Sequence, residues 1–227
     1  MNSKVISIVI LVIILILFLF LAYSCTPAPE DKEDLSEFLR ATHIIDSDHP
    51  GIVKKASELT KDCQIDVLKA KALFEFVRDS YNDNRCESFI ASEVLECGGN
   101  SCRQRSILLA ALCRAAGIPT RLHLQKVTIK NWKKEDGEII ENYTFAHGIT
   151  GIFLSDTWRL YESVGNKDKW IIWTQDEERD SEMPIEFYPD RDCLFQADEK
   201  IIIETLPVYF ADRTEEMIEL IEKIDSI

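Results

Sequence analysis

Apolar residues recur at helical spacing through the first half of the globular part of the chain. The pattern and the flanking start and stop signals predict helices over 35–44, from Pro50 onward, over 65–81 and over 102–116. The predicted inner face of the helix over 65–81 consists of Leu68, Ala72, Phe76 and Val77. A loop that carries Cys86 and Cys97 is expected before the last of these helices, which Gly117-Ile118-Pro119 should end.

The second half alternates between apolar and polar positions, as strands do. The predicted strands are 120–130, 143–154 and 157–163, with a polar connection over 131–142 and a tight turn at Ser155-Asp156. Extra strands or covering segments are expected at 170–173, 187–189 and 201–203, followed by an amphipathic helix over 212–225. Helices that precede antiparallel strands predict an α+β domain.

The N-terminal segment has a different pattern. It runs from Val5 to Ala22 without a charge or a proline, which is about the length that crosses a bilayer as a helix. Lys4 lies just before this run and the next cation is Lys32, so the positive-inside bias predicts a globular domain outside the cytoplasm. We therefore expect a membrane-associated protein with its globular domain exported.

Two kinds of anchor fit this segment. The stretch from Leu21 to Cys25 resembles a lipobox, in which the cysteine is lipidated after cleavage, whereas the length of the apolar run favours an uncleaved signal anchor. Both alternatives stay open. The predicted organisation is an anchor or lipoprotein signal peptide over 1–25, a linker over 26–34 and one globular domain over 35–227.

Composition supports a single domain and disfavours a nucleic-acid partner. The chain has 227 residues, of which 46% are hydrophobic, and this suffices for one well-filled core. The formal net charge is −14 and no basic stripe is visible. Because a phosphate backbone requires such a stripe, a role in binding nucleic acid is not expected.

The chain has seven cysteines. If Cys25 is lipidated and Cys102 serves chemistry, an odd number remains, so at least one of them stays unpaired; we predict at most two disulfides. Those remaining are Cys63, Cys86, Cys97, Cys113 and Cys193. No C-x-x-C pair suggests zinc or a dithiol site, so no metal is expected.

Cys102 is the candidate nucleophile. A cysteine in the first turn of a helix lies beside unsatisfied N–H groups and the positive end of the helix dipole, both of which favour the thiolate. Gly98 and Gly99 upstream would let the backbone approach a substrate. Cys113 lies about 16 Å farther along the same helix and is interpreted as a core residue.

His147 and Glu162 are the candidate partners of this thiol. His147 lies in mid-strand beside Gly148, which leaves room for a neighbouring group. If the two strands pair through Ser155-Asp156, Ile149 faces Glu162 and His147 lies one diagonal step away on the same face; a shift of two residues puts His147 directly opposite. A carboxylate near an imidazole fixes its tautomer and stabilises its cation.

These residues lie in segments that resemble the transglutaminase-like superfamily. The most specific part is 91–121, which contains Cys97-Gly98-Gly99-Asn100-Ser101-Cys102 and the helix that follows. Phe145-Ala146-His147-Gly148 and the strand 158–162 resemble the histidine and acid segments of the family, in the same order. The resemblance covers a core over 49–165 and leaves a C-terminal extension over 166–227.

The resemblance implies a papain-like fold, in which a cysteine-bearing helix packs on an antiparallel sheet that supplies histidine and acid. It implies thioester chemistry on peptide or protein amides, by hydrolysis or transfer to an amine, with Cys102 as nucleophile, His147 as base and Glu162 as acid. No cofactor or metal is implied. This chain differs from the family in having Glu162 where Asp is usual and Ile149 where an aromatic residue is frequent. The alternative is an inactive binding or scaffold module on the cell surface.

Overall fold

The computed structural model describes residues 34–80, 86–99, 101–134, 136–163, 186–195 and 199–227. The elements below belong to the compact unit over 35–227. The predicted anchor over 1–25, including Cys25, and nearly all of the predicted linker lie outside the described residues. In the part of the chain that is described, no helix has the length and apolar character needed to cross a membrane.

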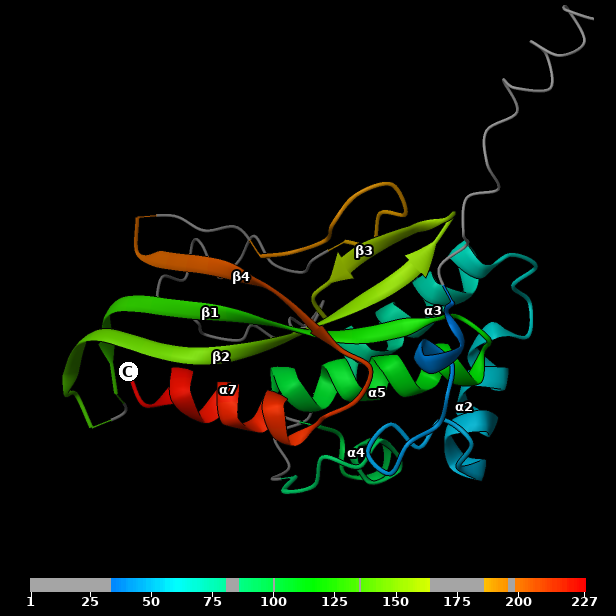
Figure 1. Cartoon of the computed structure of the whole chain (residues 1–227), viewed down its shortest axis with the longest axis horizontal. Coiled ribbons are helices and arrows are strands. Elements are labelled where there is room, and N and C mark those ends of the chain that lie inside the picture. The colour runs from blue at the N-terminus through cyan, green and yellow to red at the C-terminus, as the bar shows by residue number, and fades with distance from the viewer. Residues whose placement is uncertain (1–33, 81–85, 100, 135, 164–185, 196–198) are drawn as a thin grey trace, which may run out of the picture. The chain divides into compact units, whose positions relative to one another are not determined.

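Helices come first in the chain and a four-stranded sheet follows, so the predicted α+β class is confirmed. The helical elements are η1 (Ser36–Phe38), α2 (Pro50–Thr60), α3 (Asp66–Asp79), α4 (Ala91–Cys97), α5 (Cys102–Ala115) and α7 (Glu215–Asp225). The strands are β1 (Thr120–Lys133), β2 (Ile139–Leu154), β3 (Thr157–Tyr161) and β4 (Ile201–Phe210). Helices α5 and α7 lie in a row along one face of the sheet (Figure 1).

The sheet is antiparallel throughout, with the strand order β3-β2-β1-β4. Strands β2 and β3 form a hairpin in which Phe153 pairs with Trp158 and Thr150 with Tyr161. Ser155 and Asp156 make the two-residue turn, with φ angles of 50° and 59°, the left-handed conformation that such turns require. The unshifted register of the sequence analysis is therefore confirmed.

Among the residues that the structure describes, β3 pairs with β2 only from Thr150 onward, so no described strand lies beside the earlier part of β2 on the side away from β1. We call the backbone of residues 145–149 on that side the open edge of β2. Backbone N–H groups on such an edge need other acceptors. The candidate site lies along it.

Helix α5 is almost wholly buried between the sheet and helices α2, α3 and α4, which explains its apolar sequence. It begins at Cys102 as predicted and ends before Gly117, whose φ of 80° favours glycine. Cys113 is fully buried in this core. Burial also raises the pKa of its thiol, so the interpretation of Cys113 as a core residue is confirmed.

Several local predictions were wrong. The helix expected over 35–44 is only the three-residue η1, and the loop expected around Cys97 contains α4. In α3 the predicted inner residue Leu68 is 47% exposed. Val77 is buried as predicted, but the rest of the buried face is formed by Ala70, Leu73 and Phe74. Of the segments expected as strands or cover, 201–203 begin β4, Phe187 covers the core without forming a strand, and 170–173 lie outside the described residues.

Candidate active site

Cys102 is the first residue of α5, and a capping box determines where that helix begins. The Ser101 Oγ accepts from the Gln104 N–H at 3.2 Å, and the Gln104 Oε1 accepts from the Ser101 N–H at 3.2 Å. The box holds Cys102 in the first turn, where N–H groups and the helix dipole favour a negative charge.

Gln104 also connects α5 to the segment before it. Its buried Nε2 donates to the carbonyl of Cys86 at 2.8 Å and to that of Ser88 at 2.7 Å. Cys86 forms a disulfide with Cys97, the last residue of α4. The segment at Cys86 is thereby joined to the end of α4 by the disulfide and to the start of α5 by Gln104, so both ends of the loop that leads to Cys102 are held.

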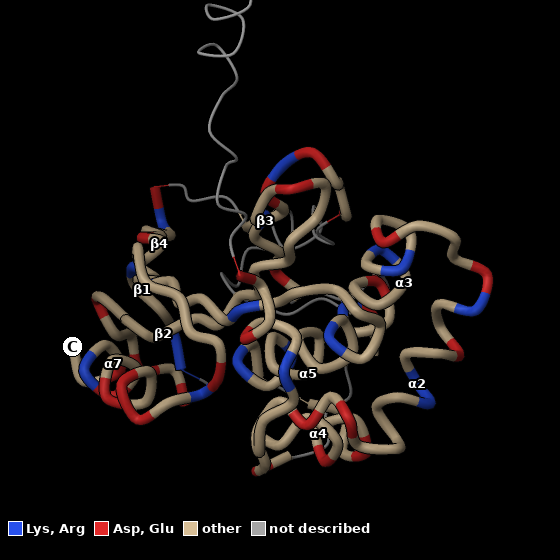
Figure 2. The backbone as a smooth tube through the Cα atoms, turned by 45° about the vertical axis from the view of Figure 1, so that its right-hand side comes forward, with Lys and Arg blue, Asp and Glu red and all other residues tan. Residues whose placement is uncertain are grey.

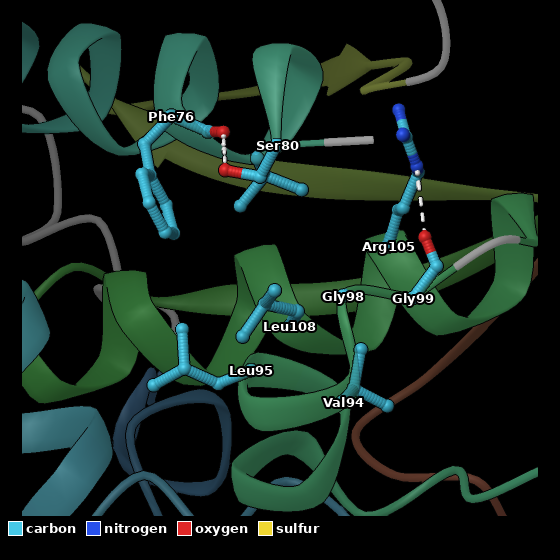
Figure 3. Close-up of a pocket in the computed structure, with 9 residues that line it drawn as sticks. Phe76, Ser80, Val94, Leu95, Gly98, Gly99, Arg105 and Leu108 are labelled. Atoms are coloured by element: carbon cyan, nitrogen blue, oxygen red, sulfur yellow. Dashed lines mark hydrogen bonds between the residues drawn. The ribbon is translucent and has the colours of Figure 1, made fainter. Parts of the chain in front are cut away.

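The loop before Cys102 is also held by Arg105, whose side chain is buried at 2% exposure. Its Nε donates to the Gly99 carbonyl at 3.3 Å (Figure 3), and its Nη1 donates to the Ser163 carbonyl at 3.0 Å, next to Glu162. A cavity of about 20 Å³ lies behind the loop among Val94, Leu108 and the arginine, enough for one water molecule. Arg105 therefore joins the nucleophile loop to the end of the acid strand.

His147 lies on β2 and is 1% exposed. The next residue, Gly148, makes the closest approach between β2 and α5: a Cβ placed on it would lie 2.9 Å from the Arg103 Cα and 3.0 Å from the Ser106 Oγ. No side chain fits there. The glycine thus lets the first turn of α5 lie against the backbone beside His147, as its position in the sequence indicated.

The structure brings the Cys102 thiol, the His147 ring and the Glu162 carboxylate together. The His147 side chain and the backbone N–H of Gly148 lie close enough to the thiol that both lower its pKa. On the other side, the Nε2 of His147 lies 2.7 Å from the Oε1 of Glu162. With Nε2 held by the carboxylate, Nδ1 is the ring nitrogen that serves the thiol.

The second carboxylate oxygen of Glu162 is also held. Its Oε2 accepts from the N–H of Phe195 at 2.8 Å, in a segment that runs beside β3 through a parallel bridge between Tyr161 and Cys193. Glu162 is 1% exposed, so both of its oxygens are bonded away from water. Sequence reasoning missed Phe195 because a backbone donor leaves no signal in residue type.

The charges of the site favour a thiolate and an imidazolium. Burial by itself would raise the pKa of Cys102, but the His147 charge, the hydrogen bonds from His147 and Gly148, and the Arg103 charge outweigh it and lower that pKa. Burial would lower the pKa of His147, yet the charges and hydrogen bonds of Cys102 and Glu162 raise it to about 10. Both shifts favour the ion pair of a thiolate and an imidazolium.

The remaining candidates are less informative. Cys63 is a partly exposed free cysteine after α2 and Cys193 is buried, so one disulfide joins the cysteines of the described residues. Among the residues that the structure describes, no group of three or more His, Cys, Asp or Glu side chains is arranged to bind a metal ion. Acidic residues gather on α4 and α7 (Figure 2).

Comparisons with known proteins identify the family of the chain. The family model described as transglutaminase-like superfamily matches residues 53–171, just over half of the chain. A candidate cysteine protease from Cytophaga hutchinsonii has a solved structure that aligns with 61% of this chain and 44% of its own, at 19% identity and a TM-score of 0.44. A candidate protease from Parabacteroides distasonis ATCC 8503 aligns with 56% of this chain and 24% of its own, at 14% identity and a TM-score of 0.34. The chain thus spans less than half of the length of either structure, and no curated protein matches it.

Proposed function

Because the chain belongs to the transglutaminase-like superfamily, we propose that it is a cysteine enzyme that cleaves or transfers the acyl group of peptide or protein amides. One observation carries the proposal. The thiol of Cys102 is at the start of a helix and beside His147, which lowers its pKa. The Nε2 of His147 lies 2.7 Å from the Oε1 of Glu162. This is the arrangement that a nucleophile, a base and an orienting acid require.

In the first step the Cys102 sulfur attacks the amide carbonyl, and the negative charge moves to the carbonyl oxygen. The N–H of Gln104 is taken by Ser101, which leaves the N–H groups of Cys102 and Arg103 for this oxygen. The His147 imidazolium then gives its proton to the leaving amine as the C–N bond breaks. The product is a thioester on Cys102 and a neutral His147.

In the second step water or a primary amine attacks the thioester. His147, again neutral, takes the proton of the incoming nucleophile, and the Cys102 thiolate leaves. Glu162 stabilises the imidazolium that forms in each step. Water as acceptor gives hydrolysis, and an amine gives transfer.

The test is the pH dependence of alkylation by iodoacetamide, followed by peptide mass spectrometry. We expect Cys102 to react fast at pH 6–7, where an ordinary thiol, with its pKa near 8.5, is mostly protonated. Partly exposed Cys63 is the internal reference and Cys102→Ser the control for assignment. If Cys102 and Cys63 react at equal rates throughout this range, the nucleophile assignment is wrong and the scaffold alternative gains.

We further propose that the domain over 35–227 lies outside the cytoplasm and is held at the membrane by the N-terminal segment. The uncharged run from Val5 to Ala22 supports the anchor, and the Cys86–Cys97 disulfide supports an oxidising compartment. A membrane-impermeant maleimide should label Cys63 in intact cells or spheroplasts. If the unaltered protein incorporates an alkynyl fatty acid and Cys25→Ser does not, the anchor is a lipid. If neither protein incorporates the fatty acid, the anchor is a helix.

A further inference from the structure

Asp225, in the last turn of α7, contacts both elements that carry the candidate nucleophile and base, helix α5 and strand β2. Its Oδ1 accepts from the backbone N–H of Ala146 at 2.7 Å, and its Oδ2 accepts from the Nη1 of Arg103 at 2.9 Å. Ala146 precedes His147, and Arg103 follows Cys102. One carboxylate therefore bridges the immediate neighbours of the nucleophile and the base.

The strand geometry shows why this bridge matters. Backbone N–H groups two residues apart on a strand point to the same side. Those of Ala146 and Gly148 therefore both point outward from the open edge of β2, away from β1. The Ala146 N–H donates to Asp225, and the Gly148 N–H lies beside the Cys102 sulfur, whose pKa it lowers. Cys102 and Asp225 thus occupy successive acceptor positions along the open edge, with His147 between them.

Neighbouring elements hold the carboxylate in this place. Met217, Ile221 and Ile224 pack into the main core, so α7 is a fixed support for its last turn. The ion pair is partly shielded, with side-chain exposures of 27% for Arg103 and 35% for Asp225.

The position is unfavourable for an acid on local grounds. The C-terminal end of a helix carries partial negative charge, and α7 already contains four glutamates (Figure 2). The four are Glu215, Glu216, Glu219 and Glu222, and all are exposed. Local helix electrostatics therefore do not explain an aspartate at 225, whereas its two contacts do.

We propose that Asp225 is a positioning residue that holds the first turn of α5 against the open edge of β2, and so keeps the Cys102 sulfur at the His147 ring. This inference rests on the proposed function. It places one part of the site in the C-terminal helix, beyond residues 53–171 that the family model matches. Asp225 itself touches no reacting atom.

The experiment uses the full chain and measures the rate of Cys102 alkylation against pH, which needs no knowledge of the substrate. We expect Asp225→Ala to slow alkylation at pH 6.5 at least tenfold and to move the rise of the profile toward higher pH. Asp225→Asn keeps an acceptor for the Ala146 N–H but loses the ion pair with Arg103, so an intermediate rate is expected. Glu219→Ala removes an exposed carboxylate from the same helix and is the matched control, with an unchanged profile.

A general loss of folding is separated by a second measurement. Thermal unfolding is recorded for each variant, and a double-mutant cycle combines Asp225→Asn with Arg103→Met. If the effects of these two changes on the alkylation rate are coupled, the positioning role of Asp225 is supported even where both changes lower stability.

The possible failures are distinct. Equal reactivity of Cys102 and Cys63 in the unaltered protein would overturn the proposed function. A reactive Cys102 in the unaltered protein, with profiles of Asp225→Ala and Glu219→Ala that superimpose on it, would overturn the role of Asp225 alone.

Discussion

The Nε2 atom of His147 lies 2.7 Å from the Oε1 atom of Glu162, and each side chain is 1% exposed. The other oxygen of Glu162 accepts from the Phe195 N–H. A carboxylate with both oxygens bonded has no freedom to rotate away from the imidazole. The longer side chain of glutamate, a departure from the usual aspartate of the family, is thus accommodated by the backbone at Phe195.

Replacing Glu162 by Gln should abolish most activity. A glutamine side chain can still accept from the Phe195 N–H, but its NH₂ would face Nε2 and require that nitrogen to be an acceptor. Nδ1 would then carry the proton and could not take one from Cys102. We expect kcat to fall by about 10³-fold or more on an amide substrate, with little change in the melting temperature. Unchanged turnover would show that the acid has no role in orienting the histidine.

Replacing Glu162 by Asp tests the reach of the side chain. The carboxylate would be withdrawn by one methylene from a 2.7 Å contact, so either His147 or Phe195 loses its partner. We expect a smaller fall than for Gln, about tenfold, which corresponds to roughly one hydrogen bond. A variant with higher activity than the unaltered protein would contradict this account of how Glu162 is held.

Replacing Gly148 by Ala should separate the strand of His147 from the helix of Cys102. The added methyl would lie 2.9 Å from the backbone Cα of Arg103, which cannot rotate away. We expect a loss of about 1–3 kcal/mol in unfolding free energy and, because a 1 Å displacement at a catalytic group is so costly, a fall of about 10²-fold in the alkylation rate of Cys102.

Gly117→Ala is the matched control for that variant. Gly117 has a φ of 80°, so alanine there is strained by about 1–2 kcal/mol, but no atom lies within 4 Å of the new methyl. Gly117 follows the opposite end of α5 from Cys102. The control should lose stability and keep its alkylation rate, and a parallel loss in both variants would mean that stability alone governs reactivity.

His123 should make the fold sensitive to acid. Burial, helped by the charge of Arg121, lowers the pKa of His123 from 6.5 to about 4. Because the folded-state pKa is the lower one, the unfolded chain binds the extra proton first, and stability present above pH 6.5 is lost as the pH falls toward 4. The shift corresponds to about 3 kcal/mol. Urea unfolding at pH 7 and pH 4.5 should show a smaller pH dependence in His123→Gln, whose amide oxygen can replace the acceptor for the Arg121 Nε.

The disulfide should stabilise the nucleophile loop. Cys86 and Cys97 are 11 residues apart, and the loss of chain entropy in a loop of that size corresponds to about 3 kcal/mol. We expect the double variant Cys86→Ser/Cys97→Ser, and the reduced protein, to lose that much unfolding free energy in chemical denaturation. A loss in the double variant that addition of a reductant increases further would point to a second redox-sensitive pair.

The parts of the fold that local signals specify were predictable. Helix α5 carries its own cap and stop residues, and the β2–β3 hairpin has a two-residue turn that determines its register. Helix α4 was missed because its first N–H groups have no local cap. They donate instead to the Ile44 carbonyl and the Asp46 Oδ1, which lie more than 40 residues earlier. The segment 35–44 was expected to be helical, but it ends in a turn instead. There the Thr42 N–H donates to the Ile45 carbonyl, and the Ile45 N–H donates to the Thr42 Oγ1.

The candidate site was predictable as far as its side chains carry chemistry. Cys102, His147 and Glu162 were selected by residue type and position, and the structure brings them into contact. What supports them was not predictable from the same patterns. Phe195 acts through its backbone, and Arg105 and Asp225 look like ordinary charged residues until the fold shows what they bind.

The fourth strand changes what counts as one folding unit. β4 pairs with β1 from residue 201 to 210, after the last residue that the family model matches, and its hydrophobic side chains share a core with Val127 and Ile129. A fragment limited to residues 53–171 would lack β4, so β1 would lose its hydrogen-bonding partner on that side and Val127 and Ile129 would lose Ile201. Expression work on this protein should accordingly take 35–227 as its shortest starting length, and sequence boundaries drawn by family likeness should not be used as cut sites.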